Sequence, residues 1–156
     1  EMLSQRKIEK HYLAICQATP SQNEIIAPIK RHPTKRQEMS VALEGGKEAV
    51  TRLSILAKSS QASLLDVELI TGRTHQIRVH LKHIGCPLIG DPLYGSIKSQ
   101  TLFNVQRQLL HARSLSFIHP RSGKRLSITA PIAKDLENCI KTLFPSFSFS
   151  LPSKTH

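Results

Sequence analysis

Residues 71–85 read Thr-Gly-Arg-Thr-His-Gln-Ile-Arg-Val-His-Leu-Lys-His-Ile-Gly and join two different sequence patterns. An apolar, alternating stretch typical of a strand leads into them, and a helical pattern leads out. The segment contains two Arg, one Lys and three His within fifteen residues. This density of cationic and titratable side chains makes it the first place to look for chemistry or for anion binding.

A helix after Thr74 accounts for the second pattern. At 100° per residue, three apolar side chains lie within about 60° of one another, and three basic ones lie within about 60° on a different face. Thr74 can cap the helix start, and Gly85 followed by Pro87 ends it. The sequence therefore predicts one buried face with a cationic stripe beside it. The apolar set is Ile77, Leu81 and Ile84, and the basic set is His75, Arg78 and Lys82.

Strand patterns surround this helix. Alternation of apolar and polar residues favours strands over 11–18, 48–57, 62–70, 109–118 and 124–129. The short polar link after residue 57 predicts an antiparallel hairpin. Pro28 restricts the apolar residues 25–29 to a sheet edge or a strand end. Residues 96–110 are mixed and compatible with a short helix.

The C-terminal part adds a last helix, which Pro131 opens and Pro145 ends. We expect the Ser-rich residues 146–156 to form a disordered tail and residues 1–145 to form one unit without repeats. The pattern as a whole predicts a mixed α+β fold with a mostly antiparallel sheet and helices packed on it. Four apolar residues with helical spacing support the last helix: Ile132, Leu136, Ile140 and Leu143.

Composition points to a polyanionic partner. The 22 Lys and Arg against 11 Asp and Glu give a formal net charge of +11. No run reaches the roughly 18 apolar residues of a membrane span, which favours nucleic acid over a membrane. Three widely spaced cysteines indicate free thiols in a reducing compartment, so we expect a cytoplasmic protein. A second basic cluster, read as a loop, either faces phosphates or is a solvated charged loop: Lys30, Arg31, Lys35 and Arg36.

Metal and cofactor chemistry has little support. No Gly-rich phosphate loop of standard spacing occurs. A zinc site made of His75, His80, His83 and Cys86 is disfavoured against hydrogen-bonded histidines, because His75 and His80 diverge by about 140° around a helix. We therefore expect no metal and no cofactor. The three aspartates, Asp66, Asp91 and Asp135, form no obvious acid–base pair.

Several segments together resemble one family. Residues 71–80 closely resemble the signature of RluA-type ribosomal large-subunit pseudouridine synthases, and so does the continuation over residues 85–95. Shorter matches follow in the family's order and near its spacing, over about residues 6–143. They are residues 10–14, 28–31, 46–51, 110–112 and 130–131.

This resemblance implies an enzyme that isomerises uridine to pseudouridine in structured RNA, without metal or cofactor. Tyr12 matches the family's Lys-x-Tyr tyrosine, which is expected to stack on the target base. Arg78 matches the signature arginine, which is expected to pair with the catalytic carboxylate. The resemblance also implies RNA-facing roles for Lys30, Arg31, Lys35 and Arg36. Further candidates for RNA binding are Arg73, His75, Gln76 and Lys82, with Arg73 and Gln76 alternatively fixing the loop.

One departure from the family is decisive. The family's catalytic Asp stands in an Arg-Leu-Asp-x-x-Thr-Ser-Gly motif upstream of the Lys-x-Tyr motif, and no such motif occurs in this sequence. The chain thus resembles the C-terminal portion of a synthase catalytic domain, which would need the N-terminal part as its partner, and we predict that it is inactive alone. The alternatives are a non-catalytic basic RNA-binding module and, less favoured because no recognition helix is evident, a basic DNA-binding domain.

Overall fold

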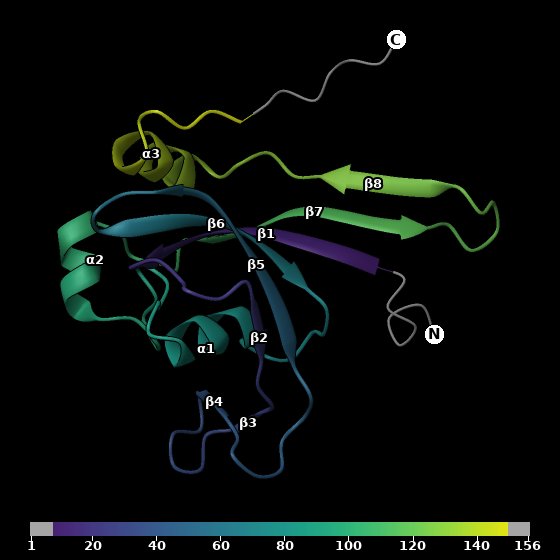
Figure 1. The fold of residues 1–156 in the computed structure, drawn as a ribbon, viewed down its shortest axis with the longest axis horizontal. Coiled ribbons are helices and arrows are strands. Elements are labelled where there is room, and N and C mark those ends of the chain that lie inside the picture. Colours follow the sequence, from purple (N-terminus) through teal and green to yellow (C-terminus); the bar gives the residue numbers. More distant parts are fainter. Residues whose placement is uncertain (1–7, 150–156) are drawn as a thin grey trace.

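The computed structural model describes residues 8–149 and shows a sheet with helices on both of its faces (Figure 1). The predicted α+β class with a mostly antiparallel sheet is confirmed. The strands are β1 (Ile8–Gln17), β2 (Glu24–Ile26), β3 (Ile29–Arg31), β4 (Met39–Val41), β5 (Val50–Lys58), β6 (Ala62–Leu69), β7 (Leu110–Ile118) and β8 (Arg125–Thr129). The helices are α1 (Gln76–His83), α2 (Ile97–Phe103) and α3 (Lys134–Leu143).

The main sheet has six strands in the order β2-β5-β6-β1-β7-β8, and every pairing is antiparallel. β1 is central, between β6 and β7, and a register shift interrupts its pairing with β7 between His11 and Tyr12. Beyond the body of the molecule, β7 and β8 continue as a protruding ribbon (Figure 1). A separate two-stranded hairpin, β3–β4, lies on the side of the molecule opposite α3 (Figure 1).

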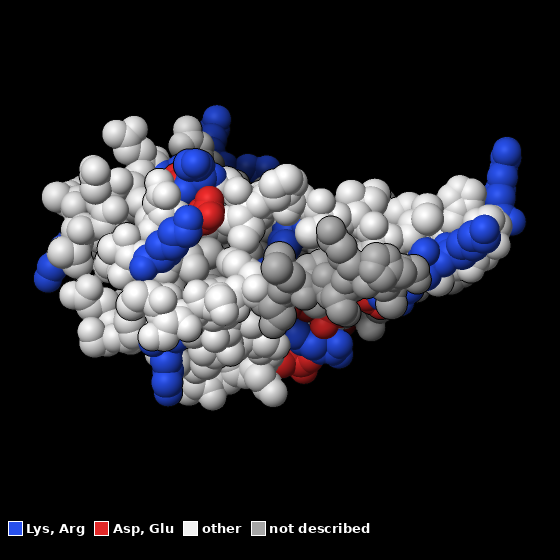
Figure 2. Space-filling model, turned by 90° about the horizontal axis from the view of Figure 1, so that it is seen from above, with Lys and Arg blue, Asp and Glu red and all other residues white. Residues whose placement is uncertain are grey.

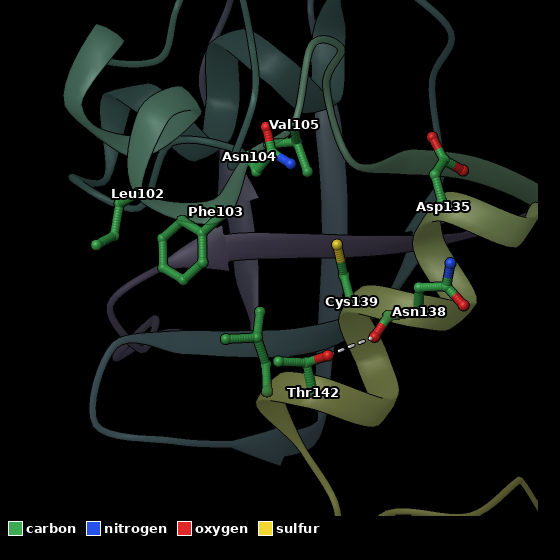
Figure 3. Close-up of a pocket in the computed structure, with 9 residues that line it drawn as sticks. Leu102, Phe103, Asn104, Val105, Asp135, Asn138, Cys139 and Thr142 are labelled. Carbon is green, nitrogen blue, oxygen red and sulfur yellow. Dashed lines mark hydrogen bonds between the residues drawn. The ribbon is translucent and has the colours of Figure 1, made fainter.

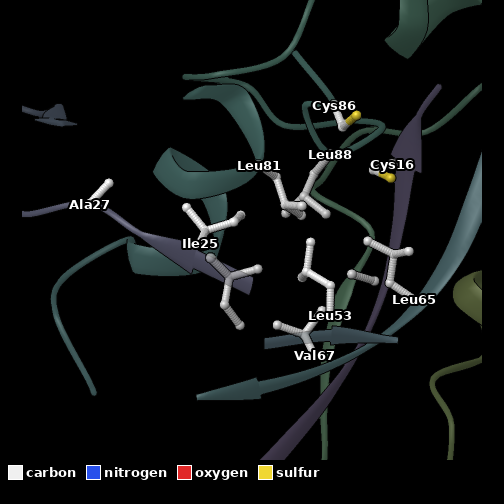
Figure 4. Close-up of a cluster of buried hydrophobic side chains, with 11 residues drawn as sticks. Cys16, Ile25, Ala27, Leu53, Leu65, Val67, Leu81, Cys86 and Leu88 are labelled. Carbon is white, nitrogen blue, oxygen red and sulfur yellow. The ribbon is translucent and has the colours of Figure 1, made fainter. Parts of the chain in front are cut away.

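Alternation along β1 supplies two of the core clusters, one on each face of the sheet. Ala14 and Cys16 face α1, where Leu81 is fully buried, and Figure 4 shows this cluster between the helix and the sheet. Leu13 and Ile15 face the opposite side and pack with α3. Because successive side chains of a strand point to opposite faces, one strand supplies both clusters. The sheet therefore separates an α1 face from an α3 face, and the predicted site residues can be assigned to one or the other.

Most predicted elements are confirmed within a residue or two, including the β5–β6 hairpin, the short helix α2 and the break at Pro28 between β2 and β3. Three starts are corrected. β1 starts at Ile8 rather than at residue 11. Thr74 does not cap α1: His75 is the N-cap, in the left-handed region at φ 55°, and no side chain caps the helix. The last helix starts at Lys134 rather than at Pro131.

The basic segment after Ile29 is also more regular than predicted. Lys30 and Arg31 belong to β3, and the loop that follows is the tip of the β3–β4 hairpin. The segment predicted as a tail is described up to residue 149, and Phe147 and Phe149 pack against the α3 cluster. The rest of that segment lies outside the described residues, so the predicted disordered tail stays a prediction. Within residues 8–149, no helix is long and apolar enough to cross a membrane.

Candidate functional site

The signature segment begins with a loop that Gln76 holds. The Gln76 amide donates to the Val50 carbonyl and to Thr51 Oγ1, both at 2.9 Å. Its Oε1 accepts from Thr71 Oγ1 at 2.8 Å and from the Arg73 backbone N–H at 3.0 Å. Gln76 is 2% exposed, and its hydrogen bonds all go to the loop and to β5. Of the two roles weighed for Gln76, this geometry favours loop fixing, and RNA binding stays a prediction.

His80 continues this polar network into the core. Its Nε2 donates to the Ala27 carbonyl and its Nδ1 accepts from Thr51 Oγ1, both at 2.9 Å. One donor nitrogen and one acceptor nitrogen are the arrangement of a neutral imidazole ring. Burial lowers the pKa of His80 below its ordinary value, despite the backbone hydrogen bond to Ala27. Among the described residues, no group of three His, Cys, Asp or Glu side chains is placed to hold a metal ion.

Arg78 makes a buried ion pair within this chain. Its Nε donates to Asp91 Oδ2 at 2.8 Å and its Nη2 donates to Asp91 Oδ1 at 2.7 Å. The side chains of Arg78 and Asp91 are 11% and 0% exposed. Burial alone would raise the pKa of Asp91, but the hydrogen bonds from Arg78 and from the backbone of Tyr94 and Leu93 hold it below the ordinary value. The carboxylate that Arg78 contacts is therefore Asp91, and a second, catalytic carboxylate stays a prediction.

Tyr94 connects the signature helix to the β3–β4 hairpin. Its hydroxyl accepts from the Met39 backbone N–H at 2.7 Å and lies 2.8 Å from His75 Nδ1. The Arg78 guanidinium carbon and Lys82 Nζ lie 5.0 and 5.6 Å from the centre of its ring. Tyr94 is 4% exposed, and burial, together with Arg78, lowers the pKa of His75. The predicted basic stripe of α1 is thus gathered around one buried tyrosine.

Tyr12 lies on the same sheet face as α1 but in a different pocket. It is half-buried against the α1 cluster, and Lys10 lies two residues before it on the same side of β1. An open pocket of about 260 Å³ is lined by both, together with residues of β7, β8 and Ala130. Lys10 Nζ is 3.5 Å from the position that a Cβ on Gly72 would occupy, so the Lys-x-Tyr strand and the signature loop adjoin.

The remaining predicted cations are exposed and lie apart from Tyr12. On the β3–β4 hairpin, Lys30 donates to the Glu44 carbonyl and Arg31 donates to the Arg36 carbonyl at 2.7 Å. Arg73 Nε donates to the Glu48 carbonyl at 2.8 Å. Lys35 Nζ lies 3.2 Å from Glu38. The predicted residues therefore lie in two regions of the structure. One is the Tyr12 pocket, and the other is the region between the β3–β4 hairpin and α1.

A further cavity, of about 390 Å³, lies between α2 and α3, where Phe103 and Cys139 line it from the two helices (Figure 3). It contains none of the predicted site residues. Its one carboxylate, Asp135, is paired with Arg107 through two hydrogen bonds of 2.6 and 2.7 Å. Asp66 is likewise paired, with His11 at 2.9 Å. Each of the three aspartates of the sequence therefore has a basic partner.

Sequence reasoning missed Asp91 and Tyr94 as members of the site. Asp91 was considered only as one of three aspartates without an obvious acid–base partner, although its loop contains two Gly and two Pro. Gly90 has φ +78°, and a Cβ there would lie 2.1 Å from the Arg107 carbonyl, so only glycine fits. This tight loop returns Asp91 to α1. The Gly-Asp-Pro-Leu-Tyr-Gly run was the signal that could have identified both residues.

Comparison with known proteins agrees with this geometry. A family model described as RNA pseudouridylate synthase matches residues 1–83 of the 156. The chain belongs to this family. An uncharacterized RNA pseudouridine synthase of Chloroflexus aurantiacus is 43% identical over 139 residues, covering 88% of this chain and 43% of the relative. The ribosomal large subunit pseudouridine synthase D of Zymomonas mobilis is 42% identical, covering 89% of this chain and 46% of the relative.

A solved structure supports the fold of this chain. The human RNA pseudouridylate synthase domain containing 1 superposes with a TM-score of 0.73 at 26% identity, covering 88% of this chain and 61% of the human one. The chain spans less than half the length of the two curated relatives. Family membership therefore identifies the fold around Tyr12 and Arg78. It does not by itself assign an activity to the whole protein.

Proposed function

We propose that this chain is part of an RNA pseudouridine synthase that isomerises uridine in structured RNA, and specifically in large-subunit ribosomal RNA. The observation that carries the proposal is Tyr12, half-buried beside an open pocket on the α1 face of the sheet. A tyrosine ring at such a place offers a stacking surface for one base. The names of relatives such as the Zymomonas enzyme support the ribosomal substrate. Free thiols at all three cysteines fit the proposed cytoplasmic location.

In the proposed reaction the N1–C1′ bond of uridine breaks, the base turns, and a C5–C1′ bond forms. The proton on C5 leaves and N1 gains a proton, so no oxidant and no cofactor is required. We place the essential carboxylate outside this chain, because the family's Arg-Leu-Asp-x-x-Thr-Ser-Gly motif does not occur in its sequence. Arg78 uses Nε and Nη2 for Asp91, which leaves its Nη1 for the catalytic carboxylate.

We further propose that the N-terminal part of the same catalytic domain completes this site. Residues directly opposite in an antiparallel pair point to one face, so Leu115 with Ile128 and Phe117 with Leu126 form an apolar strip on the ribbon. Ile128 is 58% exposed and Leu126 41% exposed. Leu115 and Ile128 also line the Tyr12 pocket. A further polypeptide segment that covers this strip would arrive beside Tyr12.

The test measures release of tritium from RNA that carries [5-³H]uridine. The chain alone is expected to release none, whereas the chain joined behind an N-terminal segment that carries the family's Arg-Leu-Asp motif is expected to release tritium. Changing the Asp of that N-terminal part to Asn is the matched control and should abolish release. Release by the chain alone would contradict the assignment of the carboxylate to another segment.

The second candidate is a non-catalytic RNA-binding module, which the net charge of +11 favours. The same experiment separates the two. If the joined protein binds RNA but releases no tritium, while the intact Zymomonas relative does so under the same conditions, the chain is a binding module.

A further inference from the structure

We propose that the cavity between the β3–β4 hairpin and α1 binds a single phosphate group of an RNA backbone. The identification of the anion as RNA phosphate rests on the proposed function. The cavity measures about 330 Å³. The β3–β4 hairpin and α1, whose residues line it, lie on the side of the molecule opposite α3 (Figure 1). Six of the residues that line it can donate a hydrogen bond or are cationic: His32, Lys35, Ser40, Lys82, His83 and Tyr94.

Two lysines approach the cavity from different elements. Lys35 comes from the hairpin tip and Lys82 from the last turn of α1. Lys82 Nζ lies 5.6 Å from the centre of the Tyr94 ring, which holds the ammonium over an aromatic face rather than free in solvent. Both residues are exposed, so their charges are available to a phosphate without a large desolvation cost.

His32 adds a donor of defined direction. Its Nδ1 accepts from the backbone N–H groups of Thr34 and Lys35, at 3.3 and 3.1 Å. Because Nδ1 is an acceptor, the neutral ring carries its proton on Nε2, where it can donate to an anion. The half-buried His32 therefore contributes a hydrogen bond even without a positive charge.

The wall of the cavity is rigid. Tyr94 is 4% exposed, and its hydroxyl accepts from the Met39 N–H at 2.7 Å, which joins the hairpin to the Asp91 loop. Val79 of α1 packs in the same cluster as Tyr94. A cavity whose wall is already ordered loses little conformational entropy when it binds a ligand. Lys35 and Lys82 thus extend from a part of the cavity that is already ordered.

One carboxylate opposes an anion in this cavity, and it provides a test. Glu38 Oε1 lies 3.2 Å from Lys35 Nζ, and the Glu38 side chain is 12% exposed. Neutralising Glu38 should therefore release the Lys35 charge and tighten phosphate binding. If the lysines did not form a phosphate site, neutralising Glu38 would not strengthen phosphate binding and removing the Lys82 charge would not weaken it.

The face of the molecule seen in Figure 2 provides the contrast. Its basic side chains are scattered, with uncharged surface between them. One of the basic residues of α3 is Lys141, whose Nζ is 2.8 Å from Glu137. Lys141→Met is the matched control for Lys82→Met, since both substitutions remove one exposed ammonium and keep an unbranched apolar side chain.

The experiment titrates the chain with inorganic phosphate at constant ionic strength and follows the imidazole C2–H signals of His32 and His83 by NMR. The wild type should show saturable shifts. Lys82→Met should weaken the apparent affinity about fivefold, as expected for one charge near 4 Å in a water-like dielectric. Glu38→Gln should strengthen it by about the same factor, and Lys141→Met should leave it unchanged.

A second measurement uses the structured RNA itself. The slope of log K against log salt should decrease by about 0.7–0.9 for Lys82→Met, the loss of one phosphate contact. Shifts that do not saturate, or equal effects of Lys82→Met and Lys141→Met, would overturn the phosphate site. Phosphate binding is read on the chain itself, so this result is independent of whether the joined protein forms pseudouridine.

Discussion

The two ends of the sheet differ in how completely the chain itself covers them. Where β5 and β6 meet α1, buried polar groups such as Gln76 and His80 have partners within the chain. Where β7 and β8 extend as a ribbon, apolar side chains are exposed on the face that leads to Tyr12. The completed end holds the signature helix in place, and the uncovered end is where the reaction is proposed to occur. The experiments below change one end at a time.

The largest loss of stability is expected from a substitution of Asp91, at the end of the sheet that α1 covers. Asp91→Ala removes the only carboxylate that pairs with the buried Arg78 within the described residues and leaves the N–H groups of Leu93 and Tyr94 without their acceptor. Breaking a buried ion pair on one side costs about 3–5 kcal/mol of unfolding free energy. Urea denaturation measures this loss.

The control for Asp91→Ala is Asp135→Ala. Asp135 and Arg107 form a pair with similar two-point geometry, but their side chains are 45% and 43% exposed. Because water screens such a pair, its loss should cost no more than about 1 kcal/mol. Equal losses for the two variants would contradict the view that burial makes the Arg78 pair important.

A smaller loss of stability is expected when the pH is lowered, because His80 resists protonation in the folded state. The pKa of folded His80 is lowered from 6.5 by burial. Below about pH 6.5 the unfolded chain therefore binds a proton that the folded chain does not, so stability falls as pH falls and is fully present above that pH. The slope from one such group reaches about 1.4 kcal/mol per pH unit.

The His80 effect is measured by urea denaturation between pH 6.5 and 5.5. His80→Gln should flatten the dependence on pH relative to the wild type, whatever its effect on stability at pH 7.5. His75, whose pKa is also lowered, contributes to the slope of both proteins equally. Identical slopes for the two proteins would show that the pKa of His80 is not lowered by its burial.

The smallest change in stability is expected at the ribbon. Ile128→Ser removes an apolar side chain from the strip beside Tyr12, whereas Ile118→Ser removes one from the opposite face, and the two residues are 58% and 44% exposed. Both should change unfolding free energy by less than about 0.5 kcal/mol. Only Ile128→Ser should reduce self-association of the isolated chain in sedimentation velocity, since its face lacks a cover. An equal reduction by Ile118→Ser would disprove a face-specific surface.

How much the sequence predicted depends on the range of the interactions. The faces of α1 were predictable because helical spacing reports local geometry directly. The β3–β4 hairpin was missed because its strands have three residues each, too few for alternation to be recognised. Thr74 was assigned as the cap because its residue type suits that role, but His75 adopts the left-handed backbone there instead.

The partner of Arg78 could not be obtained from local pattern. Asp91 is thirteen residues away and reaches α1 through a loop in which Gly90 closely approaches the Arg107 carbonyl. Tyr12 and Arg78 were found through the family resemblance, which specifies residue types at positions that periodicity does not relate. Gln76 shows the reverse case, because a polar residue in a basic signature was expected to face RNA and is buried in the core.

The central claim is that this chain supplies the base-stacking half of an active site, and Tyr12→Leu in the joined protein tests it most directly. Leucine fills a half-buried strand position but cannot stack as an aromatic ring. Tritium release should fall about 10- to 100-fold, as expected for the ~1–3 kcal/mol of base stacking on an aromatic ring, with little change in the urea midpoint. A release rate equal to that of the unsubstituted joined protein would contradict the claim.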